Sequence, residues 1–158
     1  MGDLIQEILD AIAEIAEIKF SAIWNNQASH IEAGEIYSFE MPSAFIEIVS
    51  DQNQDLGFAY QGSDITVNIH LMHEYYNGGQ MEQDFNIFSL RDLIIKKFCK
   101  FKASKTGVFI KINETQDFEH TNVYHYVVGF KTHFIDDTAV PEQYYKQPPT
   151  DLTVTRNG

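Results

Sequence analysis

The sequence predicts an α+β fold, in which two main helices pack on a mixed, mostly antiparallel sheet and the chain ends in an extended arm. Two segments, 65–76 and 121–135, carry apolar residues at alternate positions, which is the period of a half-buried strand. Two others, 3–18 and the segment from Ser89 onward, carry them at helical spacing. Beyond Asp136 both periods are lost and three prolines appear, which indicates an extended segment.

The helix after the first long strand has well-marked ends. Ser89 is the expected N-cap, Asp92 completes a capping box, and Phe88 is placed to pack on Leu93. Four lysines crowd the other end, where the partial negative charge of a helix C-terminus favours cations: Lys96, Lys97, Lys100 and Lys102. The apolar stripe, which needs a sheet to lie on, comprises Leu90, Leu93, Ile94, Phe98 and Phe101.

The N-terminal helix, with Asp3 as its expected N-cap, carries a row of carboxylates. We call this row the acidic ridge; it consists of Glu7, Asp10, Glu14 and Glu17. The spacing of three and four residues stacks like charges, which costs roughly a few tenths of a kcal/mol per pair. Two interpretations stay open: a solvated face, or a candidate interface that meets basic groups of a partner or lines a lumen after assembly.

Shorter segments complete the predicted sheet. Strands are expected at 19–24, 36–39, 43–49 and 107–113, with polar connections at 51–64 and 114–120. Segment 43–49 is apolar on nearly both faces, as expected for a sheet covered by a helix on one side and by another subunit on the other. Gly129 indicates a bulge or a close backbone approach.

The domain is expected to end at Asp136, so that residues 1–136 form a single α+β domain and residues 137–158 form the arm. Tyr144 and Tyr145 lie between prolines in this arm and have little else to bury them. They are therefore candidate interface residues for an arm laid on a neighbouring subunit. A tail without fixed structure is the alternative interpretation.

Composition and charge argue against several classes of function. A chain of 158 residues with 44% apolar composition suits one domain with a core of its own. A net charge of −12 repels nucleic acid and anionic lipid, although it suits the lining of a passage through which a polyanion slides. No secretory signal and no membrane-spanning apolar run is visible. The single cysteine, Cys99, indicates a reducing compartment and is expected to be buried and inert.

The sequence carries no recognisable motif for catalysis or metal binding. It lacks a nucleophile elbow, a phosphate-binding glycine pattern, paired cysteines and an Asp-rich calcium loop. His70 and His73 are expected to leave opposite faces of one strand, and His125 and His133 to lie about 26 Å apart along another. We therefore expect no enzyme, no metal site and no cofactor.

The order of the elements and two short sequences together carry a resemblance to a known family. The order is helix, short strands, long strand, capped helix, strand, long strand and arm, and the sequences are FSLRDLI at 88–94 and YHYVVGFKTHF at 124–134. In these features residues 1–136 resemble the tail terminator and tail-completion proteins of long-tailed bacteriophages. The resemblance implies a homo-hexameric ring that caps the tail tube and joins it to the head connector.

The function expected from this resemblance is structural. The implied partners are further copies of the chain, the tail tube protein and the head-tail connector or neck protein, in a virion assembled in the cytoplasm of the host bacterium. DNA would pass through the ring without specific binding, and no membrane is involved. One alternative is another phage neck or baseplate adaptor. An alternative of a different class is a stand-alone cytoplasmic domain with a small-molecule pocket lined by Tyr124, Tyr126 and Phe130.

Overall fold

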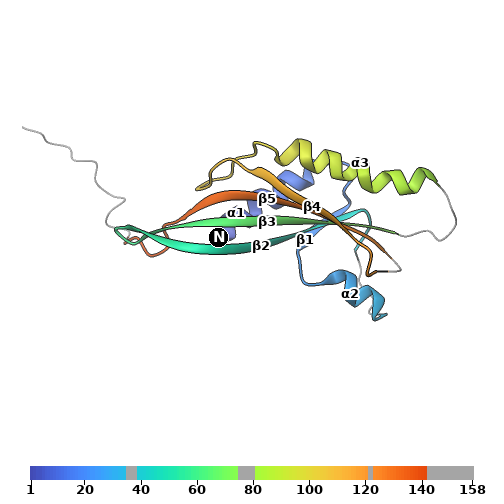
Figure 1. Cartoon of the computed structure of the whole chain (residues 1–158), viewed down its shortest axis with the longest axis horizontal. Helices are drawn as coiled ribbons and strands as arrows, with labels where there is room; N and C mark the ends of the chain where they lie inside the picture. The colour runs from blue at the N-terminus through green and yellow to red at the C-terminus, as the bar shows by residue number, and fades with distance from the viewer. Residues whose placement is uncertain (35–38, 75–80, 121–122, 142–158) are drawn as a thin grey trace, which may run out of the picture.

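The structure is a computed structural model that describes residues 1–34, 39–74, 81–120 and 123–141 (Figure 1). The described residues form, in chain order, α1 (Gly2–Ala13), β1 (Phe20–Ile23), α2 (Gln27–Glu32), β2 (Ser43–Gly57), β3 (Tyr60–Glu74), α3 (Met81–Phe98), β4 (Ile110–Asp117) and β5 (Val123–Asp136). The five strands make one sheet in the order β1-β2-β3-β5-β4. β1 is parallel to β2, and the other neighbouring strands are antiparallel. The predicted α+β class, with its mixed and mostly antiparallel sheet, is confirmed.

Two helices cover one face of the sheet, which we call the covered face. α1 and α3 lie on the same side of the strands in Figure 1, and their apolar stripes meet alternate residues of the sheet. The alternation predicted along the last strand is confirmed, because Val128, Phe130 and Phe134 are all buried in this core. The apolar stripe predicted for α3 is confirmed as well, because its members Leu90, Ile94 and Phe98 are buried in the same core.

The other face, which we call the open face, carries a much smaller apolar cluster at one end. Here α2 and the segment before it pack over Phe45, Met72 and Val123, on the opposite side of the sheet from α1 and α3 (Figure 1). The sequence predicted no helix between the strands expected at 19–24 and 36–39. The Gln27 side chain accepts a hydrogen bond from the Asn25 N–H (2.7 Å) and donates one to a β1 carbonyl (3.0 Å), and α2 begins at Gln27 itself.

β2 and β3 form a hairpin longer than the sequence predicted. Each strand has 15 residues, and their pairing continues to Gly57 opposite Tyr60. The polar connection expected at 51–64 is therefore wrong, since most of these residues extend the two strands. The residues of β2 from Asp51 onward are exposed on both faces where they are described, so no apolar alternation marks them as a strand.

Three of the four predicted helix ends are wrong. α1 begins at Gly2 and ends at Ala13, because the next amides, from Ile15, bond three residues back and tighten the chain into a turn. α3 begins at Met81, which puts Ser89 in its interior. Met, Glu and Gln before Phe88 are good helix formers, so helix formation continues upstream of the Ser89 pattern. The lysine-marked C-terminus of this helix is confirmed.

Two further expectations are corrected and one is confirmed. Cys99 is exposed rather than buried, because its neighbour Phe98 is the residue that faces the sheet. β4 begins and ends later than the strand expected at 107–113. The close approach expected at Gly129 is confirmed: a Cβ atom there would lie 1.9 Å from the Asn113 Oδ1, next to a bulge in β4.

Some predictions fall outside the described residues. They are most of the strand at 36–39, the end of the strand at 65–76, and the part of the arm that contains Tyr144 and Tyr145.

Candidate functional site

A connected row of ionisable side chains runs across the open face, and we call it the histidine chain. Four strands or their connections contribute to it, together with α2. In the order of their contacts its members are Glu47 on β2, His70 on β3, His125 on β5, Asp117 on β4, His120 in the connection from β4 to β5, and Glu32 at the end of α2.

Strand register brings the first two histidines together. In the pairing of β3 with β5, His70 lies opposite Val127 and His125 lies opposite Met72, so the two histidines are diagonal neighbours on one face. The His70 Nδ1 lies 2.9 Å from the His125 Nε2. On its other side, the His70 Nε2 lies 3.4 Å from the Glu47 Oε2. Asn68 also donates to this Glu47 oxygen, at 2.7 Å.

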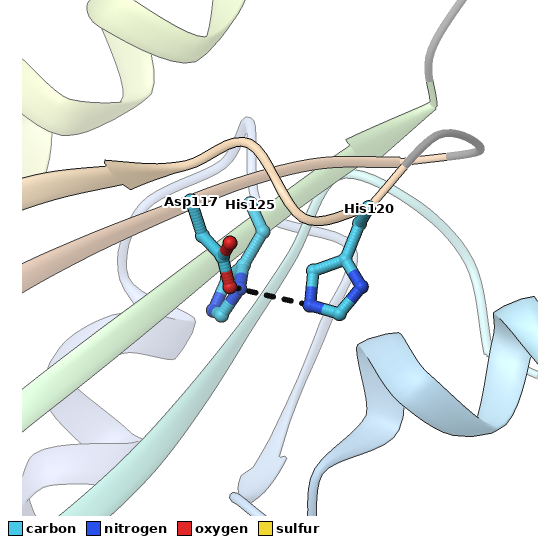
Figure 2. Close-up of side chains that lie close together, drawn as sticks. All are labelled: Asp117, His120 and His125. Carbon is cyan, nitrogen blue, oxygen red and sulfur yellow. Dashed lines mark hydrogen bonds and ion pairs between the residues drawn. The ribbon is translucent and has the colours of Figure 1, made fainter.

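The Asp117 carboxylate contacts both His125 and His120 (Figure 2). Its Oδ2 lies 3.1 Å from the His125 Nδ1 and 3.2 Å from the His120 Nε2. Its Oδ1 accepts a hydrogen bond of 2.9 Å from the Glu119 backbone N–H, which fixes the carboxylate. The His120 Nδ1 is buried and makes no hydrogen bond of good geometry, although the Glu32 Oε2 lies 3.4 Å away.

Aromatic packing shields this group from water. The indole of Trp24 stacks on the imidazole of His70, with ring centres 4.1 Å apart, and on that of His125 at 5.0 Å. Only 5% of the His125 side chain and 10% of the His120 side chain are exposed. Burial of this extent makes each charge and each missing hydrogen bond expensive.

The environment shifts the pKa values of three of these groups. Burial, helped by the neighbouring His125, lowers the pKa of His70 to about 4, against the opposing effect of Glu47. Burial also lowers the pKa of His125, and Asp117 opposes it. Burial acts to raise the pKa of Asp117, but the Glu119 N–H and the two nearby imidazoles outweigh it and leave that pKa lowered. His70 and His125 are therefore neutral and Asp117 ionised near pH 7.

Spacing along single strands does not reveal this site, because its histidines converge across neighbouring strands. The premise that no histidines converge is wrong, since His70 and His125 meet across two strands. One ligand atom each from Asp117, His120 and His125 also lies within 4.8 Å of the others, a group that could hold a metal ion. The alternation along both long strands already put His70 and His125 on the faces away from the helices. The register between β3 and β5, which sets how far apart the two histidines lie, does not follow from this alternation.

The acidic ridge does not stay on one helix. Glu7 and Asp10 lie on α1, whereas Glu14 is its C-cap and Glu17 follows it. The Glu7 carboxylate accepts the Ser104 backbone N–H at 2.7 Å, and Glu14 forms an ion pair with Lys97 of α3. Asp10 and Glu17 are exposed. Part of the ridge thus ties α1 to the region around α3, and its role as an interface stays a prediction.

Two apolar surfaces are exposed at separate places on the chain. The first, which we call the hairpin tip, consists of Leu56 and Phe58, and Phe58 is 87% exposed. The second, which we call the apolar edge, lies on and beside β4, the last strand of the sheet; it consists of Val108, Ile110, Ile112 and Phe118. In Figure 1 the turn between β2 and β3 lies at one end of the sheet, away from β4. Packing within one copy of the chain accounts for neither surface.

The side chains proposed to line a small-molecule pocket are core residues instead. Tyr126 and Phe130 are buried between the sheet and α3, and Tyr124 packs against them. A hollow of about 650 Å³ lies elsewhere, at the hairpin end of the open face. Its lining is polar, with Lys131 3.1 Å from the Asp64 carboxylate and His133 3.2 Å from it.

Comparison with known proteins gives no family. No protein-family model matches the chain, and no curated protein matches it significantly. Among the described residues, no helix is long and apolar enough to cross a membrane.

Proposed function

We propose that this chain is a structural virion protein, a tail terminator or tail-completion protein that closes into a ring, caps the tail tube and joins it to the head connector. The observation that carries the proposal is the pair of unlike apolar surfaces, the hairpin tip and the apolar edge. The resemblance in element order is the reason for proposing a ring of a phage tail and not a ring of another kind. The ring is proposed as a hexamer.

Two unlike surfaces favour head-to-tail association. When one surface of a subunit binds a different surface of the next, every copy keeps one free surface until the rotation closes a ring. The outer edge of β4 pairs with no strand among the described residues, and its exposed Ile110 and Ile112 offer side chains to a visiting segment. The hairpin tip brings Phe58 on two long strands that reach beyond the helix-covered body, as in Figure 1.

Charge supports the same assignment. A net charge of −12 is unfavourable for a protein that holds DNA, and favourable for a ring through which DNA passes. The acidic ridge and the arm with Tyr144 and Tyr145 remain the proposed contacts with neighbouring subunits, the tube or the connector.

The test uses two surface variants that leave the core intact. Phe58→Ser removes the apolar tip and Ile110→Thr weakens the apolar edge, while Ile23→Thr is the matched control at another exposed isoleucine. Head-to-tail association predicts that each of the first two variants alone loses the ring. An equimolar mixture of the two should form a dimer and nothing larger, because only one intact pair of surfaces remains.

Native mass spectrometry and negative-stain imaging of the full-length variants give the outcome. Rings of unchanged mass from both variants would overturn the head-to-tail proposal. A joining assay distinguishes the alternative role as a neck or baseplate adaptor. A tail terminator added to tails that lack the ring should restore their joining to heads, whereas an adaptor that acts elsewhere in the particle should not.

A further inference from the structure

We propose that Asp117, His120 and His125 bind one Zn²⁺ ion, with Glu32 and His70 orienting the two imidazole ligands. This inference is independent of the proposed ring, because it concerns side chains within one copy of the chain.

Two of the three separations between the ligand atoms suit a tetrahedral ion. Bonds of about 2.0–2.1 Å to Zn²⁺ place neighbouring ligand atoms roughly 3.3 Å apart. The Asp117 Oδ2 lies 3.1 Å and 3.2 Å from the ring nitrogens of His125 and His120, and all three ligand atoms are within 4.8 Å of one another. Figure 2 shows the three side chains converging from β4, β5 and the connection between them. A water molecule would complete the tetrahedron.

The number of protons available argues for a cation in this position. The histidine chain has five successive contacts of 3.4 Å or less, and each needs one proton between its two atoms. Each imidazole can supply one proton without taking on a positive charge, so three imidazoles supply three protons, and the three carboxylates supply none. Two contacts are then left with lone pairs facing each other in a buried site, which is unfavourable. A divalent ion replaces the missing protons at the two contacts of Asp117.

The three remaining protons then fall where the structure needs them. With its Nε2 on the metal, His120 carries its proton on Nδ1, the buried atom that faces Glu32 at 3.4 Å and otherwise makes no hydrogen bond of good geometry. With its Nδ1 on the metal, His125 donates from Nε2 to His70, which in turn donates from Nε2 to Glu47. Histidine ligands in proteins almost always donate their second N–H in this way.

The ligand types select the class of metal. Two imidazole nitrogens disfavour Mg²⁺ and Ca²⁺, which take oxygen ligands, and suit Zn²⁺, Cu²⁺, Ni²⁺ and Fe²⁺. Among these metals Zn²⁺ fits best, because its usual tetrahedral sites accept two imidazoles, one carboxylate and a water molecule in the fourth position. The bound ion would fasten the connection between β4 and β5 to the sheet and, through Glu32, to α2.

The test is zinc binding by the full-length protein after its metal is removed with a chelator. We expect one Zn²⁺ per chain by calorimetry and elemental analysis, and a higher melting temperature on its addition. His120→Ala and Asp117→Asn should each weaken binding at least tenfold and abolish the rise in melting temperature. His133→Ala is the matched control, because His133 also faces a carboxylate, Asp64, outside the histidine chain.

Nitrogen-15 NMR of the histidine side chains provides a readout that a merely structural role would not produce. On addition of Zn²⁺, His120 should carry its proton on Nδ1 and His125 on Nε2. The proposal is overturned if the metal-free wild-type protein binds no stoichiometric zinc. It is equally overturned if His120→Ala and Asp117→Asn bind zinc as tightly as wild type, or if in the zinc-bound protein His120 carries its proton on Nε2 or His125 carries its proton on Nδ1.

Discussion

The two faces of the sheet follow different rules. On the covered face, apolar side chains of β3 and β5 meet those of α1 and α3, and the hydrophobic effect alone explains why each residue is there. On the open face, buried ionisable groups such as His70 and His125 stand beside exposed residues such as Val49. Neither the buried ionisable groups nor the exposed apolar residues stabilise the fold of an isolated copy of the chain.

The difference between the two faces indicates where on the molecule a functional site should be sought. A face that is explained by packing holds the fold together. A face that keeps three histidines and three carboxylates in contact has a purpose beyond stability, because buried polar groups are costly unless they are fully satisfied. The predictions below separate the two faces, beginning with the largest effect.

The largest loss of stability is expected on the covered face of β5. Phe130 is fully buried there against Phe98, so Phe130→Ala should lower the free energy of unfolding by about 3–5 kcal/mol. Val127, which is half-buried on the open face of the same strand, is the control. Val127→Ala should cost less than about 1.5 kcal/mol by urea denaturation. Equal losses at the two positions would remove the distinction between the faces.

A pH dependence should arise on the open face. The unfolded chain protonates His70 near its ordinary pKa of 6.5, whereas the folded chain does so only at about 4, so the unfolded state binds more protons between these values. Stability should therefore fall by about 2–3 kcal/mol as the pH drops from 6.5 to 4. Urea denaturation at a series of pH values between 6.5 and 4, in the presence of a chelator, measures this loss of stability.

The control for this prediction is His70→Phe, which keeps a ring beside Trp24 and removes the titrating group. The groups that face His70 are Glu47 on β2, Asp117 on β4 and His125 on β5. Since His125 also has a lowered pKa, the variant should retain a shallower pH dependence. A slope equal to that of the wild-type protein would show that His70 contributes nothing.

A smaller electrostatic effect is expected at the edge of the covered face, between α3 and β4. The Arg91 guanidinium donates two hydrogen bonds to Glu114, at 2.8 and 2.6 Å, and lowers the pKa of that carboxyl to about 2. Both side chains are about a quarter exposed, so a double-mutant cycle with Arg91→Met and Glu114→Gln should give about 1 kcal/mol of coupling at pH 7.

This coupling should disappear as the pH falls from 4.5 towards 2, because the lowered pKa of Glu114 means that its contribution is present only while the carboxyl is ionised. Coupling that persists at pH 2 would contradict an ionic origin.

The smallest effect is expected on the acidic ridge. Asp10 and Glu17 are exposed, so Asp10→Asn combined with Glu17→Gln should change the free energy of unfolding by less than about 0.5 kcal/mol. If the ridge serves assembly, the same variant should fold normally and fail to form the ring, as measured by its native mass. Unfolding of this variant would place the two residues in the core and contradict both interpretations.

The sequence predicted most of the covered face and little of the open face. Alternation along β5 and helical spacing along α3 identify buried residues because one side of each element is apolar. The β2 arm of the hairpin lacks that signal, since its described residues from Asp51 onward are exposed on both sides. α2 is only six residues long and depends on its contacts with Phe45 and Met72, which no local pattern records.

The histidine chain escaped prediction for a related reason. Its members come from four strands, from the connection between β4 and β5, and from α2, so their proximity depends on the register of strand pairing and not on their spacing in the sequence. The bulge in β4 opposite Gly129 shifts that register further before Asp117 is reached. Periodicity gives the face of a strand on which a residue lies, but not its neighbour across the sheet.

The most direct test of the account is the native mass of the full-length protein over a range of micromolar concentrations. A head-to-tail hexamer predicts one closed species made of six copies of the 18.2 kDa chain, with a central opening in negative-stain images. A protein that stays a monomer at every concentration, or that forms open chains of increasing length, would contradict it.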